Sequence, residues 1–307
     1  MSRNLSAADI DAIKLLISQE RLGTFRAITH SDDDAIELHQ ASMLLSSSLM
    51  SVTGMLEIAI RNAVCSMIQQ DYGVADFLRT PPSGLHWHAL EKKKIDEAEA
   101  QARRASYSKL ESPQKDALDA IAFPHGVPAN IKHTNLAKKR QAAITVSMGQ
   151  VVSQLTIFFW KRLFSEQYEP TLWKRSLKKV FPNKTFSRAI IADHLEVFYQ
   201  ARNRLAHHEP VYGTRLERIV EAIDFLSQNL GSRTPNPESP IAKFVLPHRE
   251  LLDSQIAVFQ STFQRLTTHP DQRTALTSSP QQQRVGVLRR YYGITCRLFK
   301  RKARPND

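Results

Sequence analysis

Cysteine and glycine are both scarce in this chain of 307 residues. The two cysteines, Cys65 and Cys296, are far apart and belong to no paired motif. This excludes a disulfide framework and a cysteine-based zinc site, and it is typical of a reducing compartment. Ten glycines are few for this length, and no run alternates polar and apolar residues as strands do. Apolar residues instead recur with the helical period, so the sequence predicts an all-α fold.

Long hydrophobic runs are missing as well. The most apolar stretch, residues 144–159, is interrupted by polar residues and is too short to span a bilayer. We expect it to belong to one buried helix over residues 145–163. The N-terminal segment has acidic residues early and no long apolar core, unlike a signal peptide. The sequence therefore predicts a cytoplasmic protein with no membrane partner.

Acidic residues are outnumbered, since 42 Lys and Arg stand against 30 Asp and Glu, for a formal net charge of +12. Such a surface suits a polyanion, nucleic acid before an anionic membrane, although a basic surface can also serve solubility alone. Much of the excess follows a linker-like stretch, SRTPNPESP. We expect a helical domain over residues 1–231, a linker over 232–240 and a basic, partly helical C-terminal extension over 241–307.

The extension ends in a mixture of basic and aromatic residues, LRRYYGITCRLFKRKAR. This mixture suits contacts with phosphates together with stacking on bases, but a soluble helix or a disordered cationic tail explains it equally well. The RNA-binding candidates in it are Arg289, Arg290, Tyr291, Lys300, Arg301 and Lys302.

The helical domain contains several strong helix signals. Three aspartates at 32–34 predict the start of a long helix that reaches Tyr72 and carries a continuous apolar stripe. Residues 91–104 interleave acids and bases with little to bury, so we expect a solvated helical arm. Ser187 is predicted to cap a helix that Pro210 ends, and another helix is expected over residues 215–230.

The most informative segment is residues 201–212, ARNRLAHHEPVY, at the end of the helix that Ser187 begins. Asn203 and His207 are one turn apart on its polar face, and Arg202 borders that face. In the last turn the carbonyl dipoles stabilise an imidazolium, so a histidine can act as general acid or base near neutral pH. Arg202 can stabilise charge on phosphorus. RNA supplies its own nucleophile, the 2′-hydroxyl, so this chemistry requires no metal and no cofactor.

Structural explanations remain open at these positions. An Arg-Asn pair often bonds to neighbouring helices, and histidines at a helix C-terminus often cap carbonyls. A metal site from His207, His208 and Glu209 is disfavoured, because adjacent residues at a helix end point apart and no third ligand is evident.

Supporting residues are expected in the segment EIAIRN. Glu57 and Arg61 have the spacing of a helical ion pair, and Asn62 lies beside them. We interpret Glu57 as orienting Arg202 or His207 from a facing helix, against the alternative of an ordinary surface salt bridge.

Four segments resemble the Abi-like (abortive infection) proteins of bacteria: SQERLGTF at 18–25, MLEIAIRNAV at 55–64, the FFW…YEPTLW…FP block within 150–183, and ARNRLAHHEPVY at 201–212. The resemblance implies a HEPN-like helical bundle with long helices. Many HEPN proteins are metal-independent ribonucleases in which two protomers form one composite site. By similarity, Arg202 and His207 take the motif positions, Asn203 takes the polar position after the arginine, and His208 matches the second histidine.

The resemblance also implies a role in phage defence, as a toxin that halts the infected cell and that a small regulatory or antitoxin RNA can restrain. We therefore expect a homodimeric RNA endonuclease whose catalytic residues are Arg202, Asn203 and His207. A non-catalytic protein that binds structured RNA and a protein–protein adaptor are the alternatives.

Overall fold

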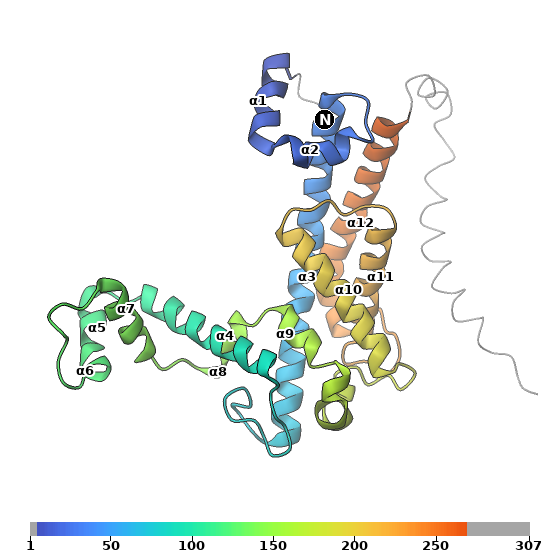
Figure 1. The fold of residues 1–307 in the computed structure, drawn as a ribbon. Coiled ribbons are helices and arrows are strands. Elements are labelled where there is room, and N and C mark those ends of the chain that lie inside the picture. Colours follow the sequence, from blue (N-terminus) through green and yellow to red (C-terminus); the bar gives the residue numbers. More distant parts are fainter. Residues whose placement is uncertain (1–4, 269–307) are drawn as a thin grey trace, which may run out of the picture. The chain divides into compact units, whose positions relative to one another are not determined.

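The computed structural model describes residues 5–268, and within this range no β-strand occurs (Figure 1). The predicted all-α fold is confirmed. The chain forms two compact units. Among the described residues, one contains residues 5–41 and 256–268, and the other is Ser42–Gln255. Helices α3 (Asp32–Tyr72) and α12 (Pro240–Thr267) contribute to both units. The boundaries of these units, after Ala41 and after Gln255, differ from the expected ones, which placed a linker over residues 232–240 between a domain and an extension.

The first unit contains α1 (Ala7–Ile17) and α2 (Gln19–Arg26). Ser6 caps α1 in a capping box with Asp9, as its sequence favours. Leu22 and Phe25 of α2 are buried, while α1 has no buried residue. The Lys14 ammonium donates to the Asp32 carboxylate at 2.8 Å, which links α1 to the start of α3.

Helix α3 supplies the longest apolar stripe of the second unit. Its length and composition would suffice to cross a membrane, as is also true of many core helices in soluble proteins. The fully buried side chains of the stripe are Leu45, Leu49, Val52, Leu56, Ile60, Val64 and Ile68. Burial of seven such side chains at the spacing of one helix face makes α3 a core element of this unit.

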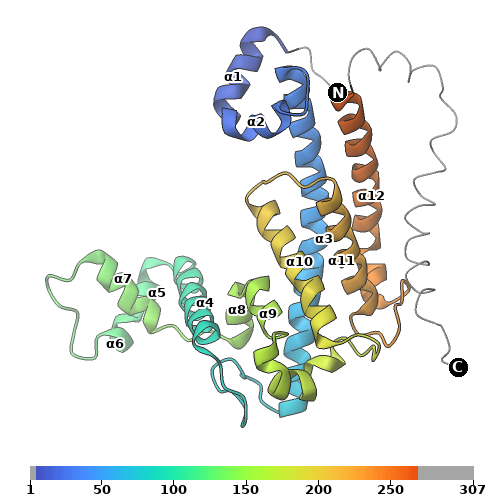
Figure 2. The same ribbon diagram turned by 45° about the vertical axis from the view of Figure 1, so that its right-hand side comes forward.

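Two helices pack side by side along α3, namely α10 (Arg188–Ala206) and α11 (Thr214–Asn229) (Figures 1 and 2). The Ser187 hydroxyl accepts the Ile190 N–H and so caps α10 as predicted. The first half of α12 joins the same unit because Arg249 donates to Asp224 of α11 at 2.9 Å. Residues 240–255 are therefore part of the bundle, and the linker-like stretch forms turns before them.

Helix α4 (Ala89–Ser108) corrects the expectation of a solvated arm. Glu91, Ile95, Ala98 and Ala102 are buried, and α4 packs against α8 (Met148–Gln154) and α7 (His133–Ala142). The buried positions recur at helical spacing, but most are too small or too polar to stand out among the charges. The short helices α5 (Ser112–Ala117) and α6 (Asp119–Ala122) connect α4 to α7.

The single helix expected over residues 145–163 is instead two helices, α8 and α9 (Ile157–Arg162). Leu155 and Thr156 between them are extended, and Thr156 has the backbone geometry of an N-cap. The break lets Leu155 enter the core, where its carbonyl accepts the Trp160 indole N–H at 3.4 Å. Trp160 is fully buried. Three short turns follow, η1 (Glu166–Tyr168), η2 (Glu169–Trp173) and η3 (Leu177–Lys179).

The Glu91 carboxylate holds α4, α9 and η1 together although it is only 1% exposed. It accepts hydrogen bonds from the Arg162 guanidinium and from the Tyr168 hydroxyl, the latter at 3.0 Å. The Tyr168 hydroxyl in turn accepts the His88 N–H at 3.2 Å.

We predict that Glu91→Ala lowers the free energy of unfolding by about 1–3 kcal/mol, because it leaves a buried tyrosine hydroxyl without an acceptor. Urea denaturation followed by circular dichroism measures this. The control is Glu97→Ala on the same helix, where the lost ion pair with Lys94 is half-exposed and contributes at most about 1 kcal/mol. Equal effects of the two substitutions would contradict the role given to Glu91.

A second prediction concerns His194 of α10, whose ring stacks on Phe225 of α11 with centroids 3.8 Å apart. Burial lowers the pKa of His194 below 6.5, against the opposing charges of Glu221 and Asp193. The unfolded chain therefore takes up the proton first, and stability falls as the pH drops below about 6.5. We expect the melting temperature to fall between pH 8 and pH 5, and to fall less in His194→Phe. His39, whose pKa burial also lowers, accounts for a remaining slope. Identical pH profiles would refute this linkage.

Candidate functional site

Arg202 and Asn203 open into one cavity of about 320 Å³ near the C-terminal end of α10. This first cavity is formed where α10 meets the start of α9 and one lysine of α4. Its lining residues are Lys94, Thr156, Ile157, Phe158, Tyr199, Arg202 and Asn203. Two cations, an amide and two aromatic rings thus surround a space at the lower end of the size range for ligand sites.

Glu57 of α3 holds two of the residues that line this cavity. One carboxylate oxygen accepts the Nε–H of Arg202 at 3.4 Å, and the other accepts the Ile157 N–H at 3.0 Å. The Glu57 side chain is 14% exposed and that of Arg202 is 36% exposed. Since the ion pair uses Nε, neither terminal nitrogen of Arg202 has a hydrogen-bond partner within residues 5–268. Those nitrogens are free to bind an anion from the solvent side.

A lysine and a glutamate lie next to the two aromatic rings that line the cavity. The rings of Phe158 and Tyr199 lie 5.6 Å apart, and the Lys161 ammonium sits 4.3 Å from the Tyr199 centroid. Lys161 also pairs with Glu196, to which Gln200 donates at 2.9 Å. Burial acts to raise the pKa of Glu196, but these hydrogen bonds outweigh it and the pKa lies below its usual value. Glu196 therefore anchors Lys161 in this structure.

His207 lies one turn beyond Asn203 and is the C-cap of α10. Its backbone N–H donates to the Asn203 carbonyl at 3.1 Å. The side chain is exposed, and it does not line the first cavity. In the part of the chain that the structure describes, the imidazole has no hydrogen-bond partner. Neither Arg202 nor His207 is enclosed in the hydrophobic core.

His208 is exposed and has φ of 54°, in the left-handed region that non-glycine residues rarely adopt. The next residue, Glu209, donates its N–H to the Arg204 carbonyl at 2.9 Å and pairs with the Arg204 guanidinium. The chain therefore leaves the helix between the two histidines, which have different backbone conformations.

The expected ion pair between Glu57 and Arg61 is not formed, which corrects that part of the sequence analysis. Glu57 uses both oxygens for Arg202 and Ile157 instead. The Arg61 Nε is buried without a hydrogen-bond partner among residues 5–268, and Asn62 is exposed. Burial raises the pKa of the neighbouring Cys65 thiol to about 12, although Arg61 opposes this shift. Of the three supporting candidates, only Glu57 bonds to residues that line the cavity, and it does not line the cavity itself.

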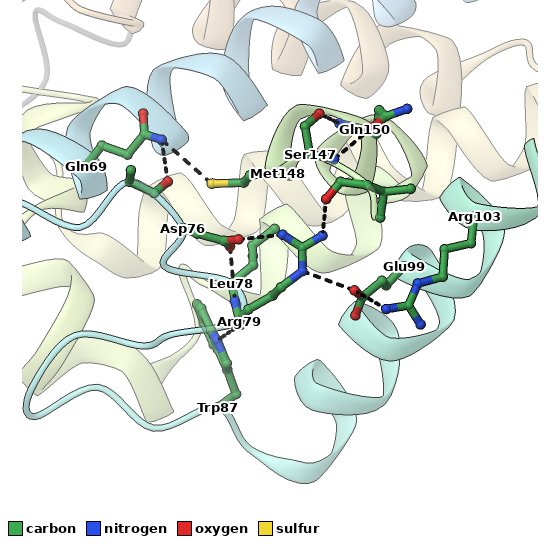
Figure 3. Close-up of polar contacts among 12 residues, drawn as sticks. Gln69, Asp76, Leu78, Arg79, Trp87, Glu99, Arg103, Ser147, Met148 and Gln150 are labelled. Carbon is green, nitrogen blue, oxygen red and sulfur yellow. Dashed lines mark hydrogen bonds and ion pairs between the residues drawn. The ribbon is translucent and has the colours of Figure 1, made fainter. Parts of the chain in front are cut away.

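The segment His86–His88 contributes to a second cavity, of about 470 Å³, between the loop before α4 and α4 itself. Its lining includes Arg79, His86, Trp87, Lys92, Asp96 and Glu99. Figure 3 shows the Arg79 guanidinium bonded to Asp76, to Glu99 and to a backbone carbonyl, that of Val146. Among the described residues no group of three or more His, Cys, Asp or Glu side chains is arranged to hold a metal ion.

The remaining RNA-binding candidates, Arg289, Arg290, Tyr291, Lys300, Arg301 and Lys302, lie outside the described residues. Sequence reasoning missed Lys94, Phe158 and Tyr199. Tyr199 is one turn before Arg202 on the same helix, a spacing that could have indicated it. Lys94 and Phe158 reach the cavity from other helices, and no local pattern marks them.

Comparison with known proteins returns no match from protein-family models, from curated proteins or from solved structures.

We predict that Glu57→Ala destabilises the fold more than Arg202→Ala does. Loss of Glu57 leaves the Ile157 N–H without its acceptor and costs about 1–3 kcal/mol, whereas loss of the partly exposed Arg202 costs at most about 1 kcal/mol. Urea denaturation measures both, with Arg204→Ala on the same helix as the control. A larger loss in Arg202→Ala would assign Arg202 a structural role.

Proposed function

We propose that this protein is a metal-independent RNA endonuclease that acts as a toxin in abortive infection, as its resemblance to Abi-like and HEPN proteins implies. One observation carries the proposal. Arg202 and Asn203 open into a cavity in which the guanidinium keeps two nitrogens free, and an exposed histidine follows one turn later on the same helix. The proposal places the protein in the cytoplasm, with RNA and no membrane as its partner.

In the proposed reaction the terminal nitrogens of Arg202 bind the non-bridging oxygens of the scissile phosphate. His207 takes the proton from the 2′-hydroxyl, whose oxygen attacks phosphorus. The bond from phosphorus to the 5′-oxygen breaks, and that oxygen receives a proton from the imidazolium of His207, which returns to its neutral form. The products are a 2′,3′-cyclic phosphate and a 5′-hydroxyl, so atoms and charge balance without a metal. Asn203 positions the substrate or holds the imidazole.

A homodimer is part of the proposal, because His207 does not line the cavity that contains Arg202 of its own chain. In a composite site, the exposed imidazole of one protomer would serve the Arg202 cavity of its partner. The exposed position of His207 at a helix end supports this arrangement, and a small regulatory or antitoxin RNA would act by occupying it.

A second candidate function is that of a non-catalytic protein that binds structured RNA. The ion pair between Arg202 and Glu57 favours this second function, because it gives Arg202 a structural role. The Glu57 carboxylate also accepts the first N–H of α9. In that case Arg202 braces α9 and α10, and the cavity binds RNA without cutting it.

Cleavage of total bacterial RNA by the purified full chain tests the proposal. We expect His207→Ala to slow cleavage about 10²–10⁴-fold without a change in melting temperature, because the side chain is exposed. His133→Ala, which removes another exposed histidine, is the control. Cleavage should continue in EDTA and yield cyclic phosphate ends.

Three results would overturn the nuclease proposal: full activity in His207→Ala, loss of activity in EDTA, or RNA bound and recovered uncut. The last result would support the second candidate function.

A further inference from the structure

The second cavity has a polar lining in which two of the four charged side chains, Arg79 and Glu99, form ion pairs. The Arg79 guanidinium donates to Glu99 at 3.1 Å, to Asp76 at 2.5 Å and to the Val146 carbonyl at 2.7 Å (Figure 3). Glu99 also accepts from Arg103 at 3.0 Å. Arg79 is therefore neutralised by two carboxylates and has no reason to attract a phosphate. It holds the loop before α4 in place and shapes the cavity.

Trp87 gives this cavity a rigid aromatic surface. Its indole N–H donates to the Leu78 carbonyl at 3.0 Å, and its ring packs against Phe77, Phe159 and Tyr168 with centroids about 6 Å away. The residue is still only half-buried, and it lines the cavity. A flat ring fixed in this way can stack on another flat ring with little loss of side-chain entropy.

Two exposed groups of opposite charge complete the lining. Lys92 and Asp96 are on the outer part of α4, and neither has an ion-pair partner within residues 5–268. The carboxylate of Asp96 can accept hydrogen bonds from an exocyclic amine of a base. The ammonium of Lys92 can contact a phosphate outside the cavity.

The first turns of α4 connect the two cavities. Lys94 lines the first cavity and Lys92 lines the second, and Lys93 between them is 70% exposed. Residues two apart lie on opposite sides of a helix, so the cavities flank α4 at a separation of about 10–12 Å, its diameter. A strand that passes over the surface of α4 follows half its circumference, about 16–19 Å. About five nucleotides of a single strand cover that path at the ~3.4 Å axial spacing of stacked bases.

We propose that the second cavity is an accessory site for one unpaired, amine-bearing base of a single-stranded RNA. The base stacks on Trp87 and donates to Asp96, while the backbone crosses Lys92–Lys94 toward Arg202. Uracil fits less well, because it has no exocyclic amine and its one donor on that edge, the N3–H, lies between two carbonyl oxygens that the carboxylate would repel. The carboxylate of Asp96, unpaired among the described residues, disfavours a phosphate within the cavity itself. The inference rests on the proposed function in that it takes RNA as the ligand, but it does not require cleavage.

Fluorescence anisotropy with labelled twelve-nucleotide RNAs of cytidine or of uridine tests the site. The full chain carries His207→Ala, so that the RNA stays intact. We expect tighter binding of oligo(C) than of oligo(U), and loss of that difference in Asp96→Ala. Lys92→Ala should weaken both about three- to tenfold and lower the salt dependence by about one phosphate contact. Lys178→Ala, an exposed lysine of η3, is the matched control.

Tryptophan fluorescence gives an independent readout, because Trp160 is fully buried and Trp87 and Trp173 are half-buried. Oligo(C) should quench the emission of the protein and of Trp173→Phe, but not that of Trp87→Phe. Trp87→Phe is included only if its melting temperature equals that of the wild-type chain. If it does not, the anisotropy measurements on Lys92→Ala and Asp96→Ala test the site alone.

The two proposals fail in different ways. Equal binding by Lys92→Ala, Asp96→Ala and the control overturns the accessory site, even if the wild-type chain cleaves RNA. Loss of base preference and affinity in these variants supports the site, even if no cleavage occurs and the nuclease proposal falls. Tighter binding of duplex than of single-stranded RNA, or no RNA binding at all, overturns the accessory site.

Discussion

The candidate site depends on the Glu57 carboxylate, whose two oxygens accept hydrogen bonds from two different helices. Glu57 projects from α3 beside the fully buried Leu56 and Ile60, so its backbone position is fixed by the core. One oxygen holds the first N–H of α9 and the other holds Nε of Arg202. Three helices thus meet at one side chain, and the guanidinium is oriented without using its terminal nitrogens. Without these two bonds, neither Ile157 nor the Arg202 guanidinium would be held in place at the first cavity.

Local signals explain why much of the fold was predictable. The helical period marks α3, α10 and α11, and side-chain caps at Ser6 and Ser187 mark where helices begin. These features depend on residues within one or two turns. The expectation that Glu57 faces Arg202 could also be made from sequence, because each residue is polar beside an apolar stripe. A polar residue at such an edge needs a partner from the facing helix.

Contacts between distant segments explain what could not be predicted. The break at Leu155 and Thr156 is set by what surrounds it, since Leu155 is drawn into the core and Glu57 caps the new helix at Ile157. The apolar composition of this stretch favours one helix. From the sequence, Glu91 is likewise expected to be one of the exposed charges of a solvated helix. Its burial depends on Arg162 and Tyr168, whose positions no local pattern reveals.

Because one face of α4 is buried, the lysines on its other faces have fixed orientations. A solvated arm would carry its lysines at random orientations, and their charge would act only as a diffuse attraction for polyanions. A helix anchored by Glu91 at its first turns instead presents successive lysines on fixed sides, with Lys94 in one cavity and Lys92 in the other. A fixed arrangement can select the path of a strand, whereas net charge cannot. The buried carboxylate of Glu91 therefore gives the lysines of α4 a fixed arrangement, which composition alone does not specify.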